Sequence, residues 1–196
     1  MVFSSLSFIY VFLALVLIAY FAVPKKLRNL VLLIFSLAFY YVGEQKLVII
    51  MIISSLTDYF CSLGIEHFRE RKGMTRLFLG LSLLINLSLL GYFKYADLFI
   101  NSFNILTGSE VPLLKIALPI GISFYTFQIL SYVIDVYRGD VPAQRNFIDL
   151  AMYVAMFPQL IAGPIVRYSD IAGSLKSRKT TLSDASQGIT RFSVGL

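Results

Sequence analysis

The feature that most constrains this chain is its series of apolar stretches, each nearly as long as a membrane is thick. The first of them, residues 6–23, has no charged side chain in 18 positions. A helix rises about 1.5 Å per residue, so about 20 apolar residues cross the hydrocarbon core of a bilayer. Several such stretches in one chain predict a protein that crosses the membrane more than once.

The composition excludes an ordinary soluble domain. Hydrophobic residues make up 58% of the 196 positions and charged residues only 14%, with a mean hydropathy of +0.78. In a soluble domain about a quarter of the residues are charged. We therefore expect an all-α polytopic membrane protein with about five to six transmembrane or re-entrant helices.

The apolar stretches divide the chain into three parts. Residues 1–95 are predicted to form four transmembrane helices, residues 112–168 a broken or re-entrant region, and residues 169–196 a polar cytoplasmic segment. In the last part, Thr181–Ser183 followed by Asp184 predicts the start of a helix. The expected spans are Leu6–Val23, Leu30–Val42, Leu47–Ile65 and Leu77–Phe93, then a short interfacial helix at Ala96–Leu106 and a further crossing at Leu113–Ile134.

The basic residues lie in short loops between these stretches. Residues 24–29 hold three of them and residues 66–76 hold four, whereas residues 43–46 hold only Lys46. The positive-inside rule therefore places the first two loops in the cytoplasm. The net charge of +6 is explained by topology and by contact with lipid headgroups. We expect the lipid bilayer, and no nucleic acid, as the partner of these charges.

Residues 118–168 combine an apolar background with charges and helix breakers. They read LPIGISFYTFQILSYVIDVYRGD, then VPAQRNFIDLAMYVAM and FPQLIAGPIVRY. A full crossing by residues 147–165 would leave the basic tail outside, against the positive-inside rule. Pro158, Gly163 and Pro164 also interrupt a straight helix. Because broken backbone at membrane depth is tolerated only inside protein or beside a wet cavity, we expect a re-entrant segment there.

A polar stripe is predicted on the helix that contains residues 121–139. At about 100° per residue, Gly121 and four polar side chains fall within an arc of roughly 80°. Those side chains are Tyr125, Gln128, Tyr132 and Asp135. Polar groups at membrane depth either line a hydrated path for a substrate or hydrogen-bond neighbouring helices. The spacing alone leaves both interpretations open.

Three further polar residues extend this set. Arg138 lies three residues after Asp135, close enough for an ion pair on a helix. Gln159 and Arg167 belong to the broken segment, and an arginine there suits either a phosphate or carboxylate of an acyl donor or a simple membrane anchor. The candidates for lining a substrate or donor tunnel are Tyr125, Gln128, Tyr132, Asp135, Arg138, Gln159 and Arg167.

Other polar residues in apolar surroundings have simpler interpretations. Asp58 is either a functional carboxylate or a hydrogen-bonded structural one, and Asn86 is expected to link helices. Cys61, the only cysteine, is expected to be a small buried residue. The single histidine, His67, lies among cations, and no substrate hydroxyl is placed near it. No spacing indicates a metal site, a Gly-x-Ser-x-Gly elbow or a Cys–His pair.

The motif-bearing segments resemble the membrane-bound O-acyltransferase (MBOAT) family. The resemblance rests on Leu118–Gln128, Ser131–Gly139 and Phe157–Arg167, and more weakly on Asn29–Gly43 and Leu90–Ala96, and it covers nearly the whole chain. It is to the bacterial branch typified by alginate O-acetylase. The resemblance implies a partial MBOAT fold.

The resemblance also implies an activity. An O-acyltransferase, with acetyl as the expected acyl group, would act on an extracellular or periplasmic polysaccharide such as alginate from the bacterial cytoplasmic (inner) membrane. The implied donor is acetyl-CoA or an acyl carrier, with no bound cofactor, and periplasmic acetylation proteins are the implied partners. The family's catalytic histidine lies in a later membrane helix. No residue here matches it, so it is expected beyond Leu196, and residues 1–196 alone are expected to be inactive.

Two alternatives remain. The nearer one is a D-alanyl transferase of the same family, which modifies teichoic acid. The other is a non-enzymatic membrane scaffold or channel fragment, for which the polar stripe would line a pore.

Overall fold

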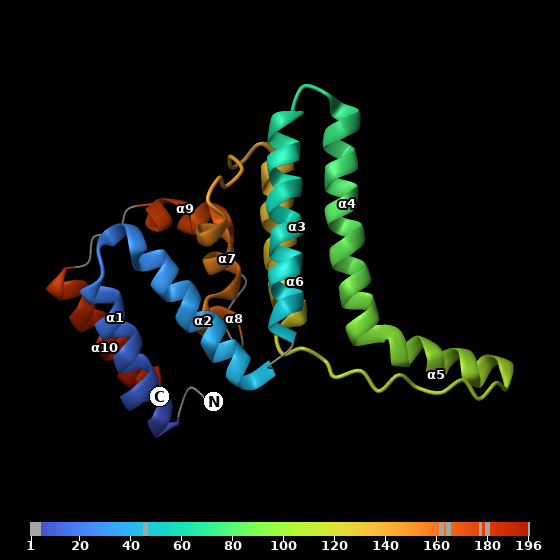
Figure 1. Cartoon of the computed structure of the whole chain (residues 1–196), viewed down its shortest axis with the longest axis horizontal. Coiled ribbons are helices and arrows are strands. Elements are labelled where there is room, and N and C mark those ends of the chain that lie inside the picture. The colour runs from blue at the N-terminus through green and yellow to red at the C-terminus, as the bar shows by residue number, and fades with distance from the viewer. Residues whose placement is uncertain are drawn as a thin grey trace.

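The computed structural model describes residues 5–44, 47–160, 163, 166–176, 178 and 181–195, and within these residues the regular structure is helical, with no strand. Figure 1 shows a bundle of long helices, with one helix, α5, extending away from its end. The helices are α1 (Ala14–Ala22), α2 (Arg28–Glu44), α3 (Val48–His67), α4 (Lys72–Leu90), α5 (Ala96–Thr107), α6 (Ile122–Arg138), α7 (Phe147–Ala155), α8 (Phe157–Leu160), α9 (Tyr168–Lys176) and α10 (Leu182–Gly195).

Among the described residues, three helical segments are long and apolar enough to cross a membrane: Lys25–Glu44, Val48–His67 and Lys72–Thr107. These match the second, third and fourth predicted spans and confirm the predicted all-α polytopic class. The first predicted span is shorter than expected. Its helical part is Phe8–Ala22, made of a π-helical turn η1 (Phe8–Leu13) and α1. The chain leaves the helix at Val23, just before the proline that lacks an amide hydrogen.

The helices α3, α4 and α6 form one compact group. They lie side by side in Figure 1, with α6 packed against both of the others. Close packing of α3 and α4 is allowed by Gly64, where an added Cβ would lie 2.8 Å from ring atoms of Phe78. This agrees with the general use of small residues where membrane helices approach one another.

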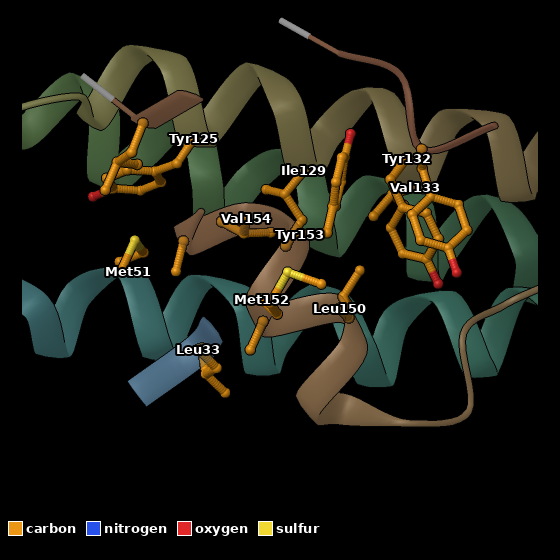
Figure 2. Packing of buried hydrophobic residues seen from close by; sticks show 14 of the residues in the cluster. Leu33, Met51, Tyr125, Ile129, Tyr132, Val133, Leu150, Met152, Tyr153 and Val154 are labelled. Carbon is orange, nitrogen blue, oxygen red and sulfur yellow. The ribbon is translucent and has the colours of Figure 1, made fainter. Parts of the chain in front are cut away.

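The helix α7 fills the space between that group and α2. It packs on α2 and on α3, and Figure 2 shows Leu150, Met152 and Tyr153 lying between the side chains of α6 and those of α2 and α3. All three are fully buried. The main hydrophobic core is therefore centred on a helix of only nine residues.

The segment that begins with α7 doubles back on itself. The helical backbone stops at Met156, which has ψ 112°, and resumes only for the four residues of α8. Both ends of the segment then meet one side chain. The Nδ2 atom of Asn29 donates to Oδ1 of Asp149 at 2.7 Å and to the carbonyl of Leu175 at 3.0 Å. Residues 149 and 175 thus lie at the same end of the bundle, beside the start of α2.

An aromatic cluster attaches the N-terminal helix to the turn of this segment. Phe12 lies edge-on to Phe157 of α8, with ring centroids 5.3 Å apart, and 5.2 Å from Phe39 of α2. Phe8 lies 5.7 Å from the ring of Phe39. Such pairs contribute about 0.5–1.5 kcal/mol each beyond the burial of area.

The region between α5 and α6 differs from the sequence prediction. The helix expected at Ala96–Leu106 is present as α5, and it turns away from α4 after the π-helical turn η4 (Gly91–Tyr95), as Figure 1 shows. The crossing predicted at Leu113–Ile134 is wrong in its first part, because residues 109–119 have no regular secondary structure, and Lys115 among them has φ 49°. This stretch contains Pro112 and Pro119, neither of which has an amide hydrogen for a helix. The carboxylate of Asp97 accepts the amides of Leu114 and Lys115 at 2.7 and 3.0 Å.

The C-terminal polar part holds two helices. The helix α10 begins with a reciprocal capping arrangement: the Asp184 carboxylate accepts the Thr181 amide at 2.9 Å, and the Thr181 hydroxyl accepts the Asp184 amide at 3.2 Å. The predicted helix start at residues 181–184 is confirmed. The side chains described in α10 are exposed.

Candidate functional site

The polar stripe of α6 faces protein on the side of the doubled-back segment. Two glycines fix the helix at its ends. Gly121 precedes it with φ 75°, and an added Cβ there would lie 2.7 Å from the carbonyl oxygen of Leu160 in α8. Gly139 ends it with φ 88°, with the Asp140 amide bonded back to the Asp135 carbonyl at 2.9 Å. The start of α6 therefore touches the turn of the doubled-back segment.

The middle of the stripe is hydrogen-bonded to α7. The Gln128 side chain donates from Nε2 to the carbonyl of Tyr153 at 2.9 Å. The Tyr153 hydroxyl donates to the carbonyl of Val166, in the returning part of the doubled-back segment, at 2.8 Å. Gln128 and Tyr153 are both buried. One pair of side chains thus links α6, α7 and the return segment.

A second network surrounds Tyr132. Its hydroxyl accepts the Gln144 amide at 2.8 Å and donates to Oγ of Ser62 on α3 at 3.1 Å. Gln144 also donates from Nε2 to the hydroxyl of Tyr168 at 2.9 Å. The ring of Tyr168 lies 4.8 Å from that of Tyr132 and 5.4 Å from that of Tyr153. The stripe is therefore, for these residues, a set of interhelical hydrogen bonds rather than an open channel wall.

The Tyr168 phenol lies outside the three candidate spans. Its burial, together with the nearby Tyr132 and Asp149, raises the pKa of Tyr168 to about 12. The Tyr168 hydroxyl therefore stays protonated and neutral at physiological pH, and it accepts the hydrogen bond from the side-chain Nε2 of Gln144.

Three of the predicted candidates have a buried polar atom without a hydrogen-bond partner in the part of the chain that the structure describes. These atoms are the hydroxyl of Tyr125, Oδ2 of Asp135 and Oε1 of Gln159. More than nine in ten buried polar groups in proteins have a partner. Such atoms are therefore places where a ligand or additional protein would find unmet hydrogen-bonding capacity.

The ion pair predicted between Asp135 and Arg138 does not form. Among the described residues the one salt bridge is that between Glu66 and Arg145, with N–O distance 3.6 Å. Asp135 is buried against the protein interior, whereas Arg138 lies exposed in the last turn before Gly139. The spacing of three residues brought the two positions near each other, but the helix directs one inward and the other to its exposed side. Arg167 is also exposed.

Asp58 belongs to a closed polar cluster between α3 and α4. Its Oδ1 accepts from Oγ of Ser82 at 2.5 Å and its Oδ2 accepts from Nδ2 of Asn86 at 2.8 Å. Oγ of Ser54 donates to Oδ1 of Asn86, also at 2.5 Å. Asp58 has no exposed surface. The cluster fits the structural interpretation of Asp58 and the linking role predicted for Asn86. Cys61, one turn further on, is buried as expected.

A depression of about 710 Å³ opens at the end of α3, lined in part by Glu66, His67 and Arg145. The Glu66 carboxylate accepts the Ala143 amide at 2.6 Å, and its other oxygen pairs with Arg145, whose side chain is 83% exposed. His67 packs on the ring of Phe68. None of the seven tunnel candidates lines this depression or the two smaller ones described at the bundle surface.

Sequence reasoning missed the partners of the stripe. Gln144 lies in a loop and gives no signal, since a single glutamine there is ordinary. Tyr153 and Tyr168 were detectable in principle, as tyrosines on either side of Pro158 and Pro164 in the sequence. Within the residues that the structure describes, no group of three or more histidine, cysteine or acidic side chains is arranged to hold a metal ion.

The sequence is similar throughout to part of several curated proteins. It is 42% identical over 199 residues to a probable alginate O-acetylase of Pseudomonas syringae pv. tomato, and 42% identical to that of Azotobacter vinelandii. It is 32% identical over 228 residues to a peptidoglycan O-acetyltransferase of Helicobacter pylori. In each case all of this chain is matched, but only 38%, 40% and 43% of the relative. The chain thus spans about two fifths of the length of these relatives. No family model and no solved structure matches.

Proposed function

We propose that this chain forms the N-terminal scaffold of a polysaccharide O-acetyltransferase of the membrane-bound O-acyltransferase family, because all of it is similar to part of the alginate O-acetylase relatives. The acceptor is a hydroxyl of an extracellular carbohydrate polymer. Alginate and peptidoglycan, the polymers in the relatives' names, are the two specific candidates. We propose the bacterial inner membrane as its location, with several crossings, and periplasmic acetylation proteins as its partners.

The reaction needs an activated acetyl group and a base. In the proposed reaction the acceptor hydroxyl attacks the acetyl carbonyl of acetyl-CoA or of an acyl carrier. The new C–O ester bond forms, the C–S thioester bond breaks, and the hydroxyl proton passes through a base to the leaving thiol. His67, the only histidine here, is exposed and packs on Phe68, so it lacks the enclosed setting of such a base. We assign the base to a histidine outside residues 1–196.

The observation that carries the proposal is the doubled-back segment held against the polar stripe. It places buried, unpartnered oxygen atoms of Tyr125, Asp135 and Gln159 on α6 and on the segment that packs against its start. In a membrane, such atoms are costly unless they meet a ligand, water or further protein. A donor path completed by the rest of the protein would use them, and this supports Tyr125, Asp135 and Gln159 among the seven tunnel candidates.

The test measures O-acetyl esters on exported polysaccharide from cells that lack the gene and from the same cells carrying the whole gene. We expect esters only in the second strain. Gln159→Leu in the whole protein is expected to lower ester content severalfold at unchanged membrane abundance, because it removes an unpartnered buried carbonyl. Gln187→Leu, the same change in the exposed helix α10, serves as the matched control and should have no effect.

Two outcomes would contradict the proposal. Esters that persist without the gene would remove the acetyltransferase assignment. Equal ester content in the Gln159→Leu and parent strains would leave the enzyme assignment but remove Gln159 from the donor path.

A further inference from the structure

A basic depression lies where α3 turns into α4 and where α6 ends. Its volume is about 300 Å³. It is distinct from the polar stripe and from the larger depression at Glu66. Its lining residues come from all three helices and their connecting turn: Ile65, Arg69, Lys72, Thr75, Arg76 and Tyr137.

The charge in this depression is uncompensated. Three of its six lining residues are cations, and none is acidic. In the residues that the structure describes, the salt bridge between Glu66 and Arg145 is the one ion pair, so no carboxylate lies within 4.0 Å of the charged nitrogens of Arg69, Lys72 or Arg76. Three clustered cations repel one another, and an anion between them relieves that repulsion.

Arg69 is held in place by contacts that leave most of its donors unused. Its Nη2 donates to the carbonyl of Val136 in the last turn of α6 at 3.0 Å. Its guanidinium also lies against Gly139, where an added Cβ would be 3.5 Å away. Arginine has five N–H donors in a planar fork that matches the oxygens of phosphate. A positioned guanidinium with free donors is the kind of group that binds phosphate with two parallel hydrogen bonds.

The start of α4 adds a second favourable contribution for an anion. The helix begins at Lys72, so the positive end of its dipole and its first amides lie at the depression. Thr75, which is buried there, keeps its hydroxyl bonded to the carbonyl of Lys72 at 3.0 Å.

The surroundings favour a lipid over a soluble phosphate. Below Arg76 the same side of α4, at 100° per residue, continues with Leu79, Leu83 and Leu87, which are half-buried or exposed. Tyr137, at the rim, is partly exposed and is a residue type that favours the membrane interface. A soluble anion makes no use of this apolar surface, whereas the acyl chains of a phospholipid lie along it when the headgroup is bound above.

We propose that the depression formed by Arg69, Lys72 and Arg76 binds the phosphate of an anionic membrane phospholipid, whose acyl chains lie along the leucines on the same side of α4. Basic depressions between membrane helices at the charged membrane surface bind such headgroups in general. The site is independent of the proposed acetyl transfer. It would anchor the α3–α4 turn at the membrane surface.

The test counts lipids retained on the protein. The protein is purified in neutral detergent, exchanged into micelles containing either phosphatidylglycerol or phosphatidylcholine with the same acyl chains, and analysed by native mass spectrometry. We expect selective retention of one phosphatidylglycerol. The double variant Lys72→Gln/Arg76→Gln should lower this affinity about 25-fold, because each cation near an anionic lipid surface contributes about fivefold.

The matched control is Lys25→Gln/Lys26→Gln, which removes the same charge from the other basic loop, where both residues are exposed. It should leave retention unchanged. An equal loss in both double variants would overturn the proposal in favour of general attraction between charges. Displacement of the lipid by inorganic phosphate at equal concentration would overturn the lipid assignment in favour of a soluble phosphate. The single variant Arg76→Gln, with an expected loss of about fivefold, keeps the test decisive if the double variant does not fold.

Discussion

Replacing Gly121 by alanine should destabilise the protein by about 3 kcal/mol, because two separate costs coincide there. Gly121 has φ 75°, a conformation that costs a residue with a Cβ about 1–2 kcal/mol. The added Cβ would also lie 2.7 Å from the backbone carbonyl oxygen of Leu160, which must move. Forcing an extra carbon into a packed site costs about 1–3 kcal/mol.

Two other glycines separate these costs. At Gly108 the φ is 69°, but nothing lies within 4 Å of an added Cβ, so Gly108→Ala carries only the conformational cost of about 1–2 kcal/mol. Gly80 is inside α4, and its Cβ also meets nothing. There alanine is the better helix former, and Gly80→Ala should be neutral or stabilising by up to about 1 kcal/mol.

The assay is unfolding of the three variants in mild detergent, followed by the helical circular dichroism signal during titration with a denaturing detergent. The predicted order of stability is Gly80→Ala, then Gly108→Ala, then Gly121→Ala. If Gly121→Ala matched Gly108→Ala, the contact between the start of α6 and α8 would be absent, and with it the reason for placing the doubled-back segment against the stripe.

Three further predictions concern single polar groups. Tyr132→Phe leaves the buried amide of Gln144 without its acceptor and should cost about 1–3 kcal/mol in the same unfolding assay. Asn86→Ala removes a donor to Asp58 and should cost about 1–2 kcal/mol, near the upper end for membrane interhelical bonds. The pKa of Asp184 is lowered by hydrogen bonds from the Thr181 amide and hydroxyl. The Asp184 carboxylate therefore stabilises α10 fully above its ordinary pKa of 3.8, and this stabilisation is lost as the pH falls through the depressed value. Amide NMR of α10 between pH 2 and 6 should show fraying at the acid end, and Asp184→Asn should remove that pH dependence.

Each of these has a result that contradicts it. A Tyr132→Phe variant as stable as Tyr10→Phe, an exposed tyrosine, would mean that the Tyr132 network contributes nothing. An Asn86→Ala variant with unchanged stability would mean that water or another group satisfies Asp58. Fraying of α10 at low pH in Asp184→Asn would place the titrating group elsewhere.

The long helices were predictable because their length and hydrophobicity are fixed by the bilayer they cross. The expected span Leu47–Ile65 differs from α3 (Val48–His67) by one residue at its start and two at its end. The break between α7 and α8 was equally visible, since Pro158 lacks the amide hydrogen that would continue α7. The division into three parts and the assignment to membrane sides stay predictions.

What sequence reasoning could not supply is which polar groups meet. Asn29 is separated by 120 residues from Asp149 and by 146 from Leu175, yet it binds both. Nothing in local pattern specifies such a pairing. The same limit explains why the ion pair predicted between Asp135 and Arg138 does not form. Their spacing places them near each other on the helix, but it does not show that Asp135 faces the interior and Arg138 the exposed side. The turn of α5 away from α4 could not be predicted either, because no proline marks it in the sequence. The backbone departs from helical geometry at Tyr95, which has ψ −5° within an apolar run.

The most direct test asks on which side of the membrane the two ends of the doubled-back segment lie. Cys61 is replaced by alanine, and single cysteines are introduced at the exposed positions Arg145, Ser174 and Glu110 in the whole protein in native membranes. An impermeant thiol reagent should label positions 145 and 174 from the same side and position 110 from the opposite side. Labelling of 174 from the side of 110 would mean that the segment crosses the membrane, and the arrangement of the candidate site described above would be wrong.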